Sequence, residues 1–449
     1  MFDKVLIANR GEIAVRIIRA CRELGVRTVA VCSTADRQAL HAQIADETVC
    51  IGPAPTKESY LDMRAIVSAC EVTGADAVHP GFGFLSENAA FARLLQRCDI
   101  KFIGPDAESI ERMGDKAQAK ITMKRAGVPV IPGSDGVVRS LEDAKAISRE
   151  IGYPVMVKAS AGGGGRGIRK VMDEQELEKA YTAAQQEALN FFGSAEVYLE
   201  KFIENPRHVE VQILCDEHGN AVHFGERDCS LQRRNQKVLE ETPCPSPQMT
   251  PALRQKMGEA SLAAARAVGY KNAGTVEYLL DGEGNFYFME MNTRIQVEHP
   301  ITEMVYGVDL VKQQIRIAAG EPITFRQEEI APQGHAIECR INAEDPAHGF
   351  RPCPGEVSSL YMPGGPGIRI DSSVYAGYTI TPYYDSMIAK LIAYAPTRME
   401  AIAKMRWALA EFLVDGVQTN IDYQLSIIAD PNFIAGDYDN GYLTRKLEQ

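Results

Sequence analysis

The chain has 449 residues, which is long enough for two or three domains and a large buried core. Hydrophobic residues at 45% and charged residues at 24% are typical of a water-soluble globular protein, and a formal net charge of −12 argues against nucleic acid as the main partner. Ten cysteines without a CxxC pair, no signal peptide and no apolar run near the ~20 residues of a membrane span predict a cytoplasmic protein with reduced thiols and no membrane partner.

The first part of the chain alternates strand and helix. Residues 4–8 form a short apolar strand, and residues 14–21 then place Ala and Ile side chains on one helical face. A strand at 27–31, a helix at 63–70 and a strand at 76–79 repeat the pattern. This order predicts a Rossmann-like parallel α/β sheet. The glycine fingerprint of dinucleotide-binding folds is missing, which argues against nicotinamide or flavin chemistry.

A loop at residues 79–88 follows the last of these strands, at the end of the sheet where open α/β folds collect ligands. It could equally be the start of a helix capped by Ser86. The sequence alone leaves both interpretations open.

A glycine-rich loop lies between strands predicted at residues 153–159 and 168–171. Residues 160–167 read Ser-Ala-Gly-Gly-Gly-Gly-Arg-Gly, and four glycines in a row expose backbone N–H groups that can fold over a polyphosphate. No Lys-Ser or Lys-Thr pair closes the loop, so it is not a Walker loop. A plain flexible turn is the alternative, but the nearby Lys116 and Lys158 favour a phosphate-binding lid.

The middle of the chain supplies further strands. Residues 196–203 read as a strand that runs into a connector, and residues 207–213 alternate polar and apolar, as in a half-buried strand. His208 in that strand, taken alone, is more often a structural histidine than a ligand contact. Residues 226–237 are dense in charge, which is typical of a solvated loop or of a clamp around anions.

A hairpin with a polar face follows. Its first arm is at residues 274–279, and its second arm begins at 285 and leads into a polar stretch. Side chains on a strand alternate between faces with period two. The polar residues that share one face are Glu290, Asn292 and Arg294, joined by Gln296 and Glu298 if the strand continues.

Two chemistries fit this face. Glu277 on the first arm should lie across from Met289 or Glu290, which would bring two carboxylates and an amide together as ligands for Mg²⁺. A guanidinium beside them suits an oxyanion. An edge strand with a solvated polar face is the alternative interpretation of this stretch.

Beyond residue 330 the chain changes character. Residues 335–342 alternate as a strand, and short β segments with Gly and Pro follow. A helix is predicted at about 399–413, with an apolar face that includes Ile402, Met405 and Leu413.

Six segments together resemble the ATP-grasp enzymes, and specifically the biotin carboxylases. They are residues 7–14, 79–88, 157–167, 200–203, 226–230 and 290–299. The run Met-Asn-Thr-Arg-Ile-Gln-Val-Glu-His at 291–299 is highly specific to that family, and the resemblance covers essentially the whole chain.

The resemblance implies an α/β and α+β architecture, the ATP-grasp fold. It consists of an N-terminal Rossmann-like domain at residues 1–114, an ATP-grasp domain at 115–330 and a C-terminal mixed α+β domain at 331–449. The glycine-rich lid would occupy about residues 131–203.

The resemblance also assigns roles to individual residues. The ATP phosphates would be held by Lys116, Lys158, Gly164 and Gly165. The adenine would lie at Glu200, Lys201, Phe202 and Ile203, with His208, Gln232 and Asn235 near the nucleotide. Two Mg²⁺ or Mn²⁺ ions would be bound by Glu277, Glu290 and Asn292. Bicarbonate would be held by Lys237, Arg294 and the backbone at Gln296 and Val297, with Glu298 as general base and Arg340 stabilising the biotin enolate.

The implied activity is the carboxylation of biotin on the biotin carboxyl carrier protein, with ATP and bicarbonate, through carboxyphosphate. This is the first half-reaction of acetyl-CoA carboxylase in fatty acid synthesis, so carboxyltransferase subunits and a homodimer are implied as well. No Ala-Met-Lys-Met biotinylation motif is present, which favours a free-standing bacterial-type subunit. A subunit of another acyl-CoA or pyruvate carboxylase is the alternative.

Two other classes fit less well. A carbamoyl-phosphate or D-alanine ligase would share the lid and the metal ligands, but not residues 294–298 followed by Arg340. A non-catalytic nucleotide-sensing subunit would be expected to have lost a metal ligand or the base.

Three positions are open. Asn235 stands where the best-known members carry His, which puts that nucleotide contact in doubt. Pro366 replaces an aromatic of the family's dimer contact, so the strength of the dimer is open. Arg340 could simply form a surface ion pair with Glu338, which shares its strand face.

Overall fold

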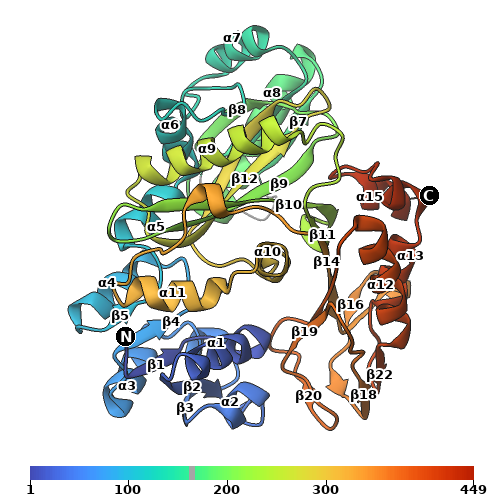
Figure 1. Cartoon of the computed structure of the whole chain (residues 1–449). Helices are drawn as coiled ribbons and strands as arrows, with labels where there is room; N and C mark the ends of the chain where they lie inside the picture. The colour runs from blue at the N-terminus through green and yellow to red at the C-terminus, as the bar shows by residue number, and fades with distance from the viewer. Residues whose placement is uncertain (161–166, 449) are drawn as a thin grey trace.

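The computed structural model describes residues 1–160 and 167–448 and is shown in Figure 1. Its first part is a five-stranded parallel sheet in the order β3-β2-β1-β4-β5, as the alternation of strand and helix predicted. The strands are β1 Lys4–Ile7, β2 Arg27–Ser33, β3 Glu47–Gly52, β4 Ala77–His79 and β5 Lys101–Phe102. The helices of this part are α1 Gly11–Glu23, α2 Leu40–Ile44, η1 Thr56–Glu58, α3 Met63–Thr73, α4 Ala89–Arg97 and α5 Ala107–Gly114.

The loop at residues 79–88 serves two purposes. The side chain of Asn88 caps α4 by accepting a hydrogen bond from the N–H of Phe91, whereas the hydroxyl of Ser86 has no hydrogen-bond partner among the described residues. The alternative of a helix capped by Ser86 is therefore wrong in its capping residue, because Asn88 stands at the N-cap position. Glu87 of the same loop reaches toward Arg294, so the loop also faces the rest of the molecule.

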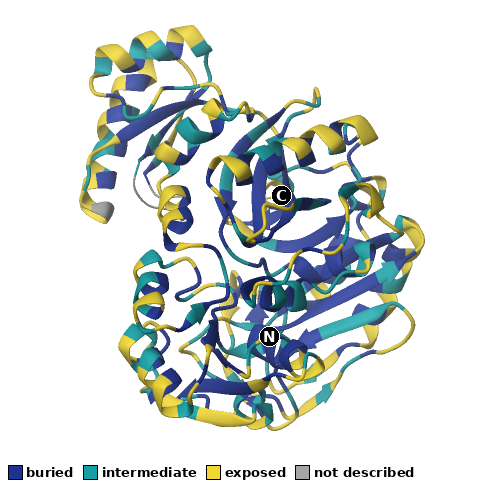
Figure 2. Cartoon of the chain, turned by 60° about the vertical axis from the view of Figure 1, so that its left-hand side comes forward, coloured by how far each residue is buried: buried dark blue, intermediate teal, exposed yellow. Residues whose placement is uncertain are grey.

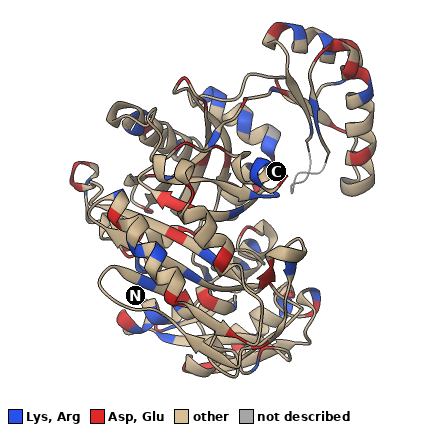
Figure 3. Ribbon diagram, turned by 90° about the vertical axis from the view of Figure 1, so that its right-hand side faces the viewer, with Lys and Arg blue, Asp and Glu red and all other residues tan. Residues whose placement is uncertain are grey.

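The lid is a small unit that stands away from the body of the molecule in Figures 2 and 3. Its three antiparallel strands, in the order β7-β6-β8, are β6 Val155–Ala159, β7 Ile168–Val171 and β8 Val197–Lys201. The helices of this region are α6 Lys116–Arg125, α7 Leu141–Ile151 and α8 Glu174–Phe192. A separate small core, which includes Val155, Leu177 and Leu199, holds the unit together. Gly164 and Gly165 lie outside the described residues.

An eight-stranded antiparallel sheet forms the centre, in the order β13-β12-β9-β10-β11-β14-β21-β19. Its strands are β9 Arg207–Cys215, β10 Ala221–Arg233, β11 Gln236–Thr242, β12 Asn272–Leu280, β13 Phe286–Asn292, β14 His335–Asn342, β19 Ile368–Ser372 and β21 Met387–Ala395. The helices that accompany it are α9 Pro251–Ala267, α10 His299–Tyr306 and α11 Leu310–Ala318, with the 3-10 turn η2 Gln327–Glu329. The sheet is continuous across residue 330, so the domain bounds given above stay a prediction.

The C-terminal part packs helices against the last strands of this sheet (Figure 1). The helices are α12 Arg398–Glu411, α13 Ile421–Ile428, α14 Pro431–Ala435 and α15 Tyr442–Leu447. The short elements are β15 Glu344–Asp345, η3 Pro346–His348, β16 Arg351–Pro352, β17 Gly355–Glu356, β18 Ser359–Tyr361, β20 Thr379–Ile380 and β22 Leu413–Asp415. The helix predicted at 399–413 thus ends earlier, because Leu413 begins β22 and is 58% exposed.

Two predictions about exposure were wrong. Every residue of β9 is buried, although its sequence alternates as in a half-buried strand. Residues 226–237, for which a solvated loop was one of two interpretations, belong largely to β10 and β11, and residues 226–233 are buried as well. The interpretation as an anion clamp stays a prediction. The reason is that these strands lie at the centre of the sheet, which is mostly buried in Figure 2. Polar side chains of neighbouring strands bind one another there, as Arg227 does with Glu210. None of the described helices combines the length and the apolar character that crossing a bilayer requires.

Candidate active site

A cleft of about 1360 Å³ lies between the N-terminal part, the lid and the central sheet. It is lined by every predicted site residue that the structure describes. These are Lys116, Lys158, Glu200, Lys201, Phe202, Ile203, His208, Gln232, Asn235, Lys237, Glu277, Glu290, Asn292, Arg294, Val297, Glu298 and Arg340. Segments more than 200 residues apart in the sequence therefore meet in one place, which is a requirement for a shared site.

Four charged residues form a row across the sheet. Glu277 of β12 pairs with Glu290 of β13 on one side and with Glu210 of β9 on the other, and Glu210 pairs with Arg227 of β10. Directly opposed residues on antiparallel strands place their side chains on the same face. The partner of Glu277, which the sequence left open between Met289 and Glu290, is Glu290.

The strand ends at Asn292, so the period-two pattern does not extend to Gln296 and Glu298. These residues lie in the loop before α10, where Glu298 occupies the N-cap position. They still reach the site, because the amide Nε2 of Gln296 donates to Glu277 Oε1 at 3.0 Å.

The ammonium of Lys237 is the centre of the site. It lies 2.6 Å from Glu210 Oε2, 2.6 Å from Glu298 Oε1 and 3.2 Å from Glu277 Oε1. Burial acts to raise the pKa of Glu298, but Lys237, Arg340 and Arg227 together hold it well below the usual value. Glu298 is therefore an ionised carboxylate in a buried position.

Arg340 binds the other oxygen of this carboxylate. Its Nη2 lies 3.1 Å from Glu298 Oε2, and its Nε donates to Glu240 Oε1 at 2.6 Å. The alternative of a surface ion pair with Glu338 is wrong, because Glu338 is fully buried and its carboxylate accepts no hydrogen bond from any described residue. Arg340 is instead a bridge between two buried carboxylates.

The guanidinium of Arg294 lies beside the predicted metal ligands. Nη2 donates to Asn292 Oδ1 at 3.0 Å, and Nε donates to Glu87 Oε2 at 2.9 Å. Glu87 was missed by the reasoning from sequence. Its only signal was its position in the ligand-facing loop at residues 79–88.

The residues predicted to hold the nucleotide are joined by ion pairs. Lys158 binds Glu200 Oε2 at 2.6 Å, and Lys116 binds Glu290 Oε2 at 2.9 Å. His208 is not an isolated structural histidine, since its Nε2 lies 2.9 Å from Glu277 Oε2. Lysines already placed against carboxylates can exchange them for phosphate oxygens when a nucleotide enters.

Asn235 lies in the turn between β10 and β11. Arg234 and Asn235 have φ angles of +50° and +62°, and this left-handed conformation is one that Asn adopts more readily than most residues. Asn235 is exposed at the edge of the cleft.

The carboxylates offer a set of oxygen donors for a hard cation. The amide Nδ2 of Asn292 donates to Glu277 Oε1 at 2.8 Å, so both ligands already adjoin. A group of residues whose ligand atoms lie within 4.8 Å of one another consists of His208, Glu210 and Glu277. Oxygen-rich sites of this kind suit Mg²⁺ or Mn²⁺. Glu210 was not predicted, although His208, Glu210 and Gln212 alternate on one strand face.

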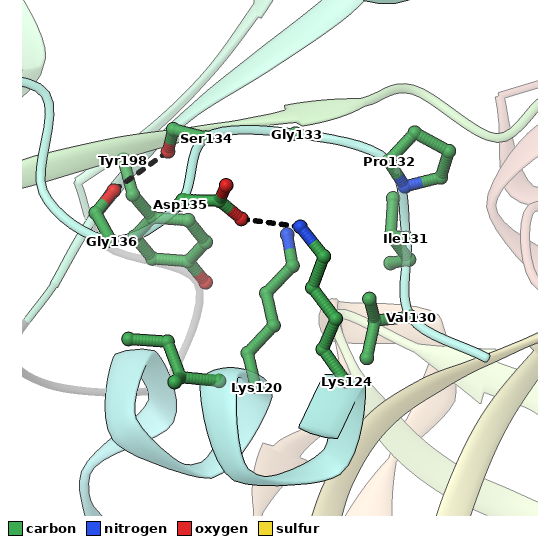
Figure 4. A pocket seen from close by; sticks show the side chains of 11 residues that line it. Lys120, Lys124, Val130, Ile131, Pro132, Gly133, Ser134, Asp135, Gly136 and Tyr198 are labelled. Carbon is green, nitrogen blue, oxygen red and sulfur yellow. Dashed lines mark hydrogen bonds and ion pairs between the residues drawn. The ribbon is translucent and has the colours of Figure 1, made fainter. Parts of the chain in front are cut away.

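A second, smaller pocket of about 200 Å³ adjoins the cleft and is shown in Figure 4. It lies between α6 and the segment at residues 130–136, and Ile131 and Tyr198 line both cavities. Lys124 and Asp135 form an ion pair of 2.6 Å on its side (Figure 4). It contains no carboxylate cluster among its lining residues, so the chemistry belongs to the larger cleft.

Three family models match in succession: the biotin carboxylase N-terminal domain at residues 1–110, the ATP-binding domain of the carbamoyl-phosphate synthase L chain at 115–326, and the biotin carboxylase C-terminal domain at 338–445. Biotin carboxylase 1 of Bacillus subtilis is 55% identical over 99% of this chain and 98% of its own length. Biotin carboxylase of Haemophilus influenzae is 57% identical over 100% and 99%.

Solved structures give the same result. A biotin carboxylase from Campylobacter jejuni, described as a complex with beta-gamma-ATP, has a TM-score of 0.94 and 49% identity over 99% of both chains. The biotin carboxylase domain of 2-oxoglutarate carboxylase from Hydrogenobacter thermophilus, described as a dimer with MgADP, ADP and bicarbonate, has a TM-score of 0.93 and 52% identity over 100% of this chain and 98% of that one. The family and the ATP-grasp fold expected from the sequence are confirmed, and the chain belongs to the biotin carboxylase family.

Proposed function

We propose that this chain is a ligase that carboxylates biotin on a carrier protein, with ATP and bicarbonate, through carboxyphosphate. The observation that carries the proposal is the arrangement around Glu298. A buried carboxylate, kept ionised by Lys237 and Arg340, lies in one cleft with Arg294 and with lysines that suit phosphates.

Glu298 would act as the base toward bicarbonate. Although burial acts to raise it, Lys237, Arg340 and Arg227 hold the pKa of this carboxyl well below the usual value, so the group is unprotonated at neutral pH, which a base must be. Lys237 and Arg294 would hold the bicarbonate anion, so that the oxygen freed of its proton attacks the γ-phosphorus of ATP.

Lys116 and Lys158 would hold the phosphates, and Glu277, Glu290 and Asn292 would hold Mg²⁺ or Mn²⁺. A bound cation supplies charge neutralisation at the transferring phosphoryl group. The connector from Glu200 to Ile203 would receive the adenine. Two anionic substrates require cationic side chains. The cleft supplies them with Lys116, Lys158 and Lys237, although the chain as a whole carries a net charge of −12.

Arg340 would act in the second step. Carboxyphosphate would break down to CO₂ and phosphate beside biotin, and the ureido nitrogen would lose its proton to that phosphate. The nitrogen would then carry negative charge before it captures the CO₂. A guanidinium placed beside that charge stabilises it in the transition state.

We propose the biotin carboxyl carrier protein and carboxyltransferase subunits as partners, a homodimer as the assembly and acetyl-CoA carboxylase as the complex. A 2-oxoglutarate or pyruvate carboxylase is the second candidate, because solved relatives include biotin carboxylase parts of both. All ten cysteines are free thiols, which favours the reducing cytoplasm.

The function is tested by ADP release with Mg²⁺, with and without bicarbonate and free biotin. We expect bicarbonate to stimulate release and biotin to increase it further, with carboxybiotin as product. ADP release that responds to neither bicarbonate nor biotin would contradict the proposal. Stimulation by ammonia or D-alanine would favour another ATP-grasp ligase.

Glu290→Gln is expected to lose activity mainly through the metal, because an amide replaces one of the carboxylates offered to a hard cation. Raised Mg²⁺ or Mn²⁺ should restore part of the rate. The measurement is ADP release as a function of metal concentration, with Glu217→Gln as a control on an exposed carboxylate outside the cleft. Full activity of Glu290→Gln at ordinary metal concentration would show that the hairpin is not the metal site.

Asn235→His is expected to be tolerated, because both side chains can hydrogen-bond a ribose hydroxyl and both occur in the left-handed conformation of this turn. The KM for ATP should change by less than about tenfold, the effect of a single hydrogen bond. Steady-state kinetics with ATP as the varied substrate measures this. A large loss of kcat at saturating ATP would contradict this prediction and would show that Asn235 has a role beyond nucleotide binding.

A further inference from the structure

Lys390 of β21 is fully buried, which is unusual for a charged side chain. Its Nζ donates to the carbonyl oxygen of Val297 at 2.9 Å, lies 3.1 Å from Glu12 Oε1 and lies 3.8 Å from Asp371 Oδ2. Burying an ammonium is costly unless its hydrogen bonds are well made. The contacts of this residue should therefore show what it does.

The contact with Val297 is directed at the active-site loop. In the sheet, Lys390 lies directly opposite Arg340, so two neighbouring cations serve the same loop from adjacent strands. Arg340 binds the side chain of Glu298, whereas Lys390 binds the carbonyl that precedes it. The carbonyl of Val297 and the N–H of Glu298 belong to one planar peptide, so fixing the oxygen fixes the plane from which Glu298 extends.

The neighbouring carboxylates explain the burial of the Lys390 ammonium less well than the Val297 carbonyl does. Both oxygens of Asp371 already accept hydrogen bonds from Arg369, from Nε at 2.9 Å and from Nη2 at 2.7 Å. Burial raises the pKa of Glu12 to about 7 although Lys390 acts to lower it, so the ion pair does not offset the burial of that carboxyl. The contact with the Val297 carbonyl at 2.9 Å is the shortest that Lys390 makes among the described residues.

We propose that Lys390 is a positioning residue for the reaction: it holds the Val297–Glu298 peptide, and through it the base and the bicarbonate contacts of the loop. Lys390 is not among the described residues that line the cleft. This inference rests on the proposed function. A purely structural ion pair with Glu12 would predict loss of stability alone.

The test compares Lys390→Met and Lys390→Arg with Asp371→Asn, which removes a charge from the same buried cluster without a contact to Val297. Thermal midpoints and steady-state constants are measured for the complete chain. Lys390→Met should raise the KM for bicarbonate by about tenfold or more and leave the KM for ATP within about twofold. Asp371→Asn should lower the thermal midpoint and leave the KM for bicarbonate within about twofold.

Lys390→Arg keeps a buried cation but moves the donor, so it should fold and show a smaller increase in the KM for bicarbonate than Lys390→Met. A wild-type KM for bicarbonate in either variant overturns the inference, and Lys390→Arg decides if Lys390→Met does not fold. An equal rise in Asp371→Asn overturns it as well. The wild-type chain is assayed alongside: without bicarbonate-stimulated ADP release the proposed function itself fails, whereas stimulation with unaffected Lys390 variants removes only this inference.

Discussion

Lys237→Met is expected to abolish bicarbonate-dependent ATP cleavage and to lower the free energy of unfolding by about 3–5 kcal/mol, the usual loss when one partner of a buried ion cluster is removed. The ammonium lies within 3.2 Å of three carboxylates, those of Glu210, Glu277 and Glu298. Without it, these buried anions face one another. At least one must then take up a proton at neutral pH, and a protonated Glu298 cannot act as the base.

The two parts of this prediction are measured separately, by urea unfolding and by ADP release with and without bicarbonate. Lys124→Met is the matched control, because Lys124 forms an exposed ion pair with Asp135 outside the cleft (Figure 4). Exposed pairs contribute ~1 kcal/mol or less. If Lys237→Met cleaves ATP in response to bicarbonate at the wild-type rate, Lys237 is not part of the reaction.

The close approach of Glu277 and Glu290, which we propose as metal ligands, could be predicted because the hairpin is local. Glu277 and Glu290 lie on adjacent arms joined by a short turn, so the period of two and the length of the turn set which side chains meet. The sequence left the register of the two arms open by one residue, so that Glu277 could lie across from Met289 or Glu290. A bulge between Glu277 and Tyr278 is the kind of irregularity that the pattern of residues does not display.

The burial of Glu210 and Arg227 could not be predicted in the same way. A strand with alternating polar residues normally has one solvated face. Here the polar residues of neighbouring strands satisfy one another: Arg227 Nε donates to Glu210 Oε1 at 2.6 Å, and its Nη1 donates to Gln212 Oε1 at 2.8 Å. Only the order of strands in the sheet shows this, and that order depends on contacts between distant segments.

Of the loop residues that join the site, Gln296 and Glu298 received their roles from the family resemblance, whereas Glu87 was not predicted at all. Gln296 and Glu298 lie beyond the end of β13, where the period of a strand no longer applies. Glu87 comes from a loop that is 207 residues away from Arg294 in sequence. Physical reasoning from local patterns has no means to bring such segments together.

Arg340→Ser is expected to make the free energy of unfolding depend more strongly on pH. Burial raises the pKa of Glu240 to about 7, and Arg340 is the first of the groups that lower it, so the substitution raises this pKa further. Between 4.5, the ordinary value, and the folded pKa, the native protein holds a proton that the unfolded chain has released, so stability falls as pH rises through this window. The loss relative to wild type should therefore be smaller at about pH 5 than at about pH 8, as measured by urea unfolding.

The same substitution should separate the two chemical steps. Glu298 keeps its contact with Lys237 at 2.6 Å when Arg340 is removed, so bicarbonate-dependent ATP cleavage should continue. Biotin loses the guanidinium that stabilises its anion, and deleting one charged transition-state contact typically lowers a rate by ~10²–10³. More ATP is then consumed for each carboxybiotin formed. ADP and carboxybiotin are measured in one reaction, with Arg351→Ser as the control, since Arg351 is exposed and outside the cleft. If both products fall in proportion in Arg340→Ser, the arginine acts on a step that both share, and its assignment to the enolate is wrong.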